Sequence, residues 1–191
     1  MTRILKDLIA RTRERERARR VFFSFDYEHD IGRVNRIRDM AGVVATSAAG
    51  FSDASLWKDA ERAGAAEVES LISDALWMTS VTVICIGSRT RSRKYVDYEI
   101  IRSVERGNGL IGIQVNELKD ARDRADSVGR TPLTLISAGA PLYRYLNEFQ
   151  LRTRIEEAAR RAERSRQADV SGAAVAGGRA GSGRQGQSVA G

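Results

Sequence analysis

The sequence of 191 residues contains one cysteine, one histidine and two prolines, and aromatic residues make up only 6% of it. A single Cys and a single His exclude a disulfide within the chain and any zinc site built from four Cys or His ligands. We predict no metal centre. Cys85 lies inside an apolar run at residues 81–86. We therefore expect it to be a small buried side chain in a reducing compartment.

Long apolar runs are also missing. No apolar run reaches ten residues, whereas a membrane-spanning helix needs about 20. The first twenty residues contain basic side chains but no continuous apolar segment of the kind found in a signal peptide. We therefore predict a cytoplasmic protein without a membrane partner.

The net charge of +7 is concentrated at the two ends of the chain. Residues 1–20 hold eight basic and three acidic side chains, and residues 151–191 hold eight and four. The stretch 21–150 holds sixteen basic and eighteen acidic side chains, so it is nearly neutral. Any contact with nucleic acid is therefore expected only through the basic termini, for which the alternative role is to keep the protein soluble.

Composition divides the chain into three parts. Residues 1–19 read as a basic helical extension with one short apolar stripe. Residues 20–166 carry the apolar patterns of a folded domain that closes with a helix. Residues 167–191 are rich in Gly, Ala and Arg and contain no aromatic residue. We expect this last part to be a disordered tail, because it has too little apolar surface to offset the entropy lost on ordering.

Strand and helix patterns alternate through the folded part. Strands are predicted at residues 21–25, 43–44, 81–86, 110–115 and 133–136. Helices are predicted at residues 30–40, 59–77, 92–106 and 143–164, with a long loop over residues 45–59. This alternation predicts an α/β fold of the flavodoxin-like class. Its five-stranded, mainly parallel sheet has the order 2-1-3-4-5, with helices on both faces.

In this strand order, ligands bind beyond the carboxyl ends of strands 1 and 3, where the winding of the sheet reverses. Ser24, Phe25 and Asp26 lie at the end of the first predicted strand, and Ser88 follows the third predicted strand. We therefore expect substrate-binding residues at these two places.

The helix predicted at residues 92–106 carries the most informative pair. Tyr95 and Glu99 are one helical turn apart, about 40° around the axis, so they lie on the same flank. Glu99 is then expected at the rim of the buried stripe, where an aromatic ring and a carboxylate line one pocket. The alternative is a surface Glu99 that is bridged to Arg102 or Arg106 of the same helix.

Three stretches, residues 20–25, 48–57 and 79–120, resemble the TIR-like domain family of the Thoeris anti-phage defence system (ThsB-like). The resemblance implies a TIR fold and a catalytic Glu on the helix after strand 3. Glu99 occupies that position. Tyr95 stands where many TIR enzymes have Trp. The family also uses the loop after strand 1, which here corresponds to Ser24, Phe25 and Asp26.

The resemblance further implies an activity. An enzyme of this family is an NAD+ glycohydrolase or ADP-ribosyl cyclase, which cleaves the nicotinamide–ribose bond and makes a cyclic ADP-ribose-type signal that activates a partner effector. NAD+ is then a substrate and no cofactor is needed. Phe25 and Tyr95 are expected to stack on a ring of NAD+, and Ser88 to hold pyrophosphate oxygens. Self-association through the domain and a phage-derived trigger are expected as well.

Two other functions remain as alternatives. One is a non-catalytic TIR adaptor that only self-associates or docks with a partner. The other is an enzyme like nucleoside deoxyribosyltransferases, which share the fold class and use a carboxylate at a glycosidic bond. The first would not consume NAD+, and the second would cleave deoxynucleosides instead.

Overall fold

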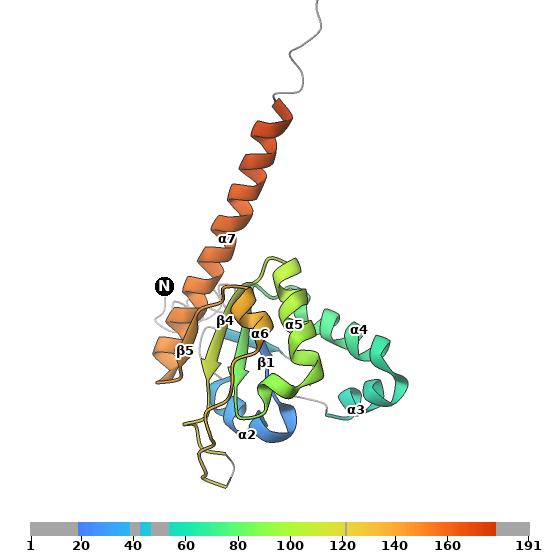
Figure 1. The fold of residues 1–191 in the computed structure, drawn as a ribbon, viewed down its shortest axis with the longest axis vertical. Helices are drawn as coiled ribbons and strands as arrows, with labels where there is room; N and C mark the ends of the chain where they lie inside the picture. Colours follow the sequence, from blue (N-terminus) through green and yellow to red (C-terminus); the bar gives the residue numbers. More distant parts are fainter. Residues whose placement is uncertain (1–18, 39–42, 47–53, 121, 179–191) are drawn as a thin grey trace, which may run out of the picture.

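The computed structural model describes residues 19–38, 43–46, 54–120 and 122–178 (Figure 1). The predicted basic helical extension therefore lies outside the described residues, apart from Arg19, which begins the first strand. Residues 179–191 of the predicted tail also lie outside them.

A parallel sheet forms the centre of the domain. Its strand order is β2-β1-β3-β4-β5, and every neighbouring pair is parallel. The strands are β1 Arg19–Ser24, β2 Val43–Thr46, β3 Val81–Ile86, β4 Gly109–Gln114 and β5 Leu142–Arg144. The α/β class and the order of the strands agree with the sequence-based prediction.

The position of the fifth strand was predicted wrongly. Residues 133–136 belong to a short helix, α6 Leu133–Ser137, and β5 lies further along the chain. Only Leu135 of this helix is buried, while Leu133 and Ile136 are exposed. A short apolar run does not distinguish a strand from one turn of helix by its pattern alone.

The remaining helices are α2 Tyr27–Arg38, α3 Ala54–Ala63, α4 Ala65–Leu76, α5 Lys94–Glu105 and α7 Glu148–Gly178, with a 3-10 turn η1 at Thr90–Ser92. The helix predicted at 59–77 is in fact two helices, and α3 together with β2 occupies much of the predicted loop 45–59. The break falls at Gly64, whose φ of 124° is a backbone conformation that only glycine adopts readily.

Helices cover both faces of the sheet, because its strands are apolar on both sides. On one face, α2 and α7 pack on the alternate strand residues Val21, Phe23, Val83, Ile111 and Ile113. On the other face, α4 packs on Phe22, and α5 and α6 pack on Ile84 and Ile86. The sheet is therefore the middle layer of three, and β1 and β3 lie at its centre.

Helix α7 runs to Gly178 and extends well away from the rest of the domain (Figure 1). Residues 167–178 are thus helical, and the prediction that they are disordered was wrong. The first half of α7 is anchored on the core by Leu151 and Ile155. An anchored helix is already nucleated, and the alanines that follow are the best helix formers.

Cys85 is fully buried in β3, as predicted. Burial raises the pKa of its thiol far above the ordinary range, so the group stays protonated and unreactive. Among the described residues, no helix combines the length and the apolar character needed to cross a membrane.

Candidate functional site

The carboxylate of Glu99 lies inside the domain and not on its surface. Four residues of α5 are buried at helical spacing, namely Val96, Glu99, Ile100 and Ser103. Glu99 is 6% exposed, so it is more buried than a position at the rim of the stripe suggests, and the alternative of a surface Glu99 bridged to Arg102 or Arg106 was wrong. Val96, Ile100 and Ser103 mark this buried stripe in the sequence, but the charge of Glu99 gives no sign that it is buried with them.

Ser24 provides the hydrogen bond that Glu99 receives. Its Oγ donates to Oε2 of Glu99, and both side chains are buried. Ser24 is the last residue of β1, and α5 follows β3, the neighbour of β1 in the sheet. The structure therefore brings together two residues that the sequence analysis had selected separately.

Burial raises the pKa of Glu99 to about 8, and the hydrogen bond from Ser24 opposes this shift. Removing a carboxylate from water disfavours its charged form, and only a nearby cation or several hydrogen bonds offset that cost. Ser24 is the only described group that favours the charged form here. The carboxyl group of Glu99 is therefore protonated at neutral pH in this structure and is poised to ionise beside a cation.

Glu99 opens into a cavity of about 360 Å³. The aromatic side chains that line the cavity are Phe25, Tyr27, Trp57 and Tyr95. The charged side chains that line it are Glu61, Arg93, Lys94 and Glu99. The cavity thus combines ring-stacking walls, two cations and one buried carboxyl group, and its volume falls in the usual range for small-molecule sites.

The four aromatic residues that line the cavity form two contacting pairs. The rings of Trp57 and Tyr95 meet edge to face with centroids 5.6 Å apart. The rings of Phe25 and Tyr27 are 6.2 Å apart. Phe25 and Tyr95 were predicted from the sequence as binding residues, and the structure places both in this cavity with Glu99. Sequence reasoning gave Trp57 and Tyr27 no role.

Asp26 is fully buried and does not line the cavity. Its Oδ1 accepts a hydrogen bond from the backbone N–H of Glu28 and lies 3.5 Å from Nε of Arg93, and its Oδ2 lies 3.1 Å from Nδ1 of His29. Nη1 of Arg93 is 3.5 Å from Oε2 of Glu28. Asp26, Glu28 and His29 are close enough together to hold a metal ion. Asp26 and Glu28 also contact Arg93. We therefore assign the cluster to positioning the guanidinium of Arg93 at the cavity.

Ser88 lies outside the cavity lining. Its Oγ donates to Oδ2 of Asp126 at 2.6 Å. The turn η1 separates Ser88 from the start of α5. Ser88 thus follows β3 as predicted, but it does not line the cavity in which it was expected to hold pyrophosphate oxygens. Arg93 and Lys94, at the start of α5, supply the positive charge of the Glu99 cavity. The sequence signal for them was the basic run that begins the helix.

The chain matches a known protein family and a named relative. The sequence profile of the family described as "Thoeris protein ThsB, TIR-like domain" matches residues 22–120, just over half of the chain. A protein of Bacillus cereus (strain MSX-D12) named "Putative cyclic ADP-D-ribose synthase ThsB1" is 45% identical over 117 residues. These cover 60% of this chain and 61% of the relative's length. The matched range 22–120 contains every residue of the cavity described above.

Proposed function

We propose that this chain, which belongs to the TIR-like domain family of the Thoeris protein ThsB, is an NAD+-processing enzyme of anti-phage defence. It cleaves the bond between nicotinamide and ribose and makes a cyclic ADP-ribose-type signal. The observation that carries the proposal is the buried carboxyl group of Glu99 at an aromatic, cationic cavity within the matched range. The name of the Bacillus cereus relative supports the same reaction.

Glu99 is the proposed catalytic residue. Nicotinamide in NAD+ is a cation and leaves as a neutral molecule that keeps the bonding electron pair, so the leaving group needs no general acid. Positive charge develops at the same time on the ribose carbon that loses it. A carboxylate beside this carbon stabilises the oxocarbenium-like transition state. The cationic substrate also favours the ionised form of Glu99, so binding of NAD+ and loss of the Glu99 proton support each other.

The aromatic walls are proposed to hold the planar rings of NAD+. Phe25, Trp57 and Tyr95 present ring faces or edges to the cavity, and aromatic pairs prefer offset or edge-to-face contact. Stacking of this kind fixes the nicotinamide ring and so places the ribose against Glu99.

Arg93 and Lys94 are proposed to bind the pyrophosphate, the role expected of Ser88. Asp26 and Glu28 each contact the guanidinium of Arg93 at 3.5 Å. An arginine fixed in this way offers its remaining N–H groups to phosphate oxygens without further ordering. Asp26 is then a positioning residue and not one that touches the substrate.

Cyclisation follows if water is kept from the ribose cation. A nucleophilic atom elsewhere in the same ADP-ribose forms the new bond to the ribose carbon and gives up a proton, so the product is an isomer of cyclic ADP-ribose. We propose that this signal acts on an effector protein. Self-association of the domain and a phage-derived trigger are part of the same proposal.

The test is incubation of the full chain with NAD+, alone and with lysate of phage-infected cells, followed by mass spectrometry. Release of nicotinamide with a product lighter than ADP-ribose by one water supports the cyclase. Nicotinamide with linear ADP-ribose alone identifies a hydrolase. No release under either condition would contradict the proposal and favour the adaptor.

A further inference from the structure

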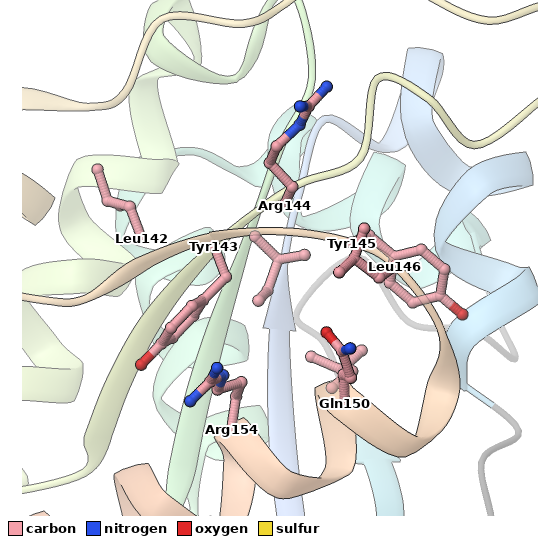
Figure 2. Close-up of a pocket in the computed structure, with 9 residues that line it drawn as sticks. Leu142, Tyr143, Arg144, Tyr145, Leu146, Gln150 and Arg154 are labelled. Atoms are coloured by element: carbon pink, nitrogen blue, oxygen red, sulfur yellow. The ribbon is translucent and has the colours of Figure 1, made fainter.

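A second cavity, of about 460 Å³, lies between β5 and the first turns of α7 (Figure 2). It shares no lining residue with the Glu99 cavity, and β5 and α7 lie beyond the family match at 22–120. We propose that this cavity is a binding site for a purine mononucleotide, distinct from the site of NAD+ cleavage.

The walls of the cavity suit a planar ring. Its buried lining residues Ile113 and Leu151 are apolar and belong to the main core. Figure 2 shows Tyr143 beside Arg154 on one side and Tyr145 on the other. Both tyrosines are partly buried against the same core cluster, which limits their movement. Nucleobases stack on rings of this kind in proteins that bind single strands.

Two arginines give the cavity a positive wall, and each already has one carboxylate partner, Glu117 for Arg144 and Glu157 for Arg154. Among the described residues that line it, the charged ones are Arg144 and Arg154, and none is acidic. The guanidinium of Arg154 lies 4.5 Å from the centre of the Tyr143 ring, and its Nη1 donates to Glu157 at 2.9 Å. These two contacts hold a planar cation at the cavity wall with N–H groups to spare. A phosphate is the anion that such a guanidinium binds best.

Two uncharged polar groups complete the set. The Gln150 side chain lies at the cavity, where Figure 2 shows its amide end. An amide carries both a donor and an acceptor, which is the combination needed to pair with the edge of a purine. Burial raises the pKa of the Tyr145 phenol, and the charge of Glu148 adds to this shift. Tyr145 therefore remains a neutral hydrogen-bonding group.

The absence of an acid also separates the two cavities by function. The Glu99 cavity has a carboxyl group where a sugar cation would form, whereas no described residue of the second cavity offers one. The second site is therefore expected to bind a nucleotide without cleaving it.

The test uses AMP and adenosine, titrated calorimetrically into the full chain. AMP contains no nicotinamide, so the proposed enzymatic activity cannot cleave it, but it is one half of NAD+, so variants of both cavities are compared. We expect AMP to bind about tenfold or more tightly than adenosine, the worth of one charge-assisted hydrogen bond. Arg154→Ala should reduce AMP to the affinity of adenosine, and Tyr143→Leu should weaken both. Tyr95→Ala, in the other cavity, should change neither.

Two results would overturn the proposal. One is no heat of AMP binding at millimolar concentration. The other is binding that Tyr95→Ala removes and Arg154→Ala retains, which would place AMP in the Glu99 cavity. Arg154→Lys is the second variant. It keeps the charge and loses the planar guanidinium, so it should bind AMP less tightly than the wild type and more tightly than Arg154→Ala. Circular dichroism melting confirms that each variant folds.

Discussion

The hydroxyl of Ser24 donates a hydrogen bond to the carboxyl group of Glu99, and so links the end of β1 to the middle of α5 across 75 positions of sequence. The bond favours the ionised form of a group that burial otherwise keeps protonated. Ser24 ends β1 and α5 follows β3, its neighbour in the sheet, which is where the winding reverses and α/β proteins bind their ligands. This relationship makes the chemistry of the site depend on pH in a way that can be measured.

Replacement of Ser24 tests that dependence directly. The Ser24 hydrogen bond lowers the pKa of Glu99, so Ser24→Ala should raise it further. If the ionised carboxylate is the active form, the rise in NAD+ cleavage rate with pH should move to higher pH in Ser24→Ala. Ser24→Thr keeps the hydroxyl and should keep the wild-type profile. A profile that is unchanged in Ser24→Ala would show that this bond does not set the ionisation.

The stability of the protein should also depend on the Glu99 proton. The pKa of Glu99 is about 8 in the folded protein, against 4.5 for an unperturbed Glu. The folded state therefore binds the proton more tightly, and its contribution is complete below pH 4.5 and is lost as pH rises toward 8. Urea denaturation should show wild type losing stability relative to Glu99→Gln over this range. A constant difference between the two would contradict the assignment.

Arg93 should determine the affinity for the pyrophosphate. It lines the cavity and is fixed by Asp26 and Glu28. Arg93→Ala should raise the KM for NAD+ about tenfold or more, the cost of one lost charge-assisted hydrogen bond. Nicotinamide riboside lacks the pyrophosphate, so its cleavage should change much less. Equal losses for both substrates would indicate that Arg93 acts on the fold and not on the phosphate.

Gly109 should tolerate no side chain, because α7 crosses β4 closely at this point. A Cβ added there would lie 2.4 Å from the backbone oxygen of Ala158. Gly109→Ala should therefore lower the free energy of unfolding by about 1–3 kcal/mol, the usual cost of overpacking. Ser165→Ala, at an exposed position of α7, is the control. Equal stability of the two variants would show that α7 does not pack here as described.

The sheet was largely predictable from the sequence because its inner strands are apolar on both faces. Residues 81–86 and 110–115 have no alternation, which is typical of strands covered on both sides. Strand β5 was not predictable in this way. It has three residues, exposed or half-buried, and pairs only with β4 in the described part of the chain. Its position depends on that pairing, which leaves no pattern in the sequence.

The candidate site was predictable in part. Glu99 and Tyr95 followed from helical spacing and from the family resemblance, and Phe25 from its place after a strand. The burial of Glu99 was missed because a carboxylate in the apolar stripe of a helix reads as a surface residue. Arg93 was missed because only the folded chain shows that Asp26 and Glu28 fix its side chain. The sequence shows which residues lie near a site, whereas the side chains that each of them contacts depend on tertiary structure.

The central claim is that Glu99 is the catalytic residue for the cleavage of NAD+. Two matched variants test this claim most directly. Glu61 and Glu99 both line the cavity, but Glu61 is exposed and Glu99 is buried. Nicotinamide release should be measured for wild type, Glu99→Gln and Glu61→Gln under the condition that activates wild type. Glu99→Gln should lose at least about 10²-fold in rate, the usual cost of removing a group that stabilises the transition state, while Glu61→Gln stays near wild type. Undiminished release by folded Glu99→Gln would contradict the account.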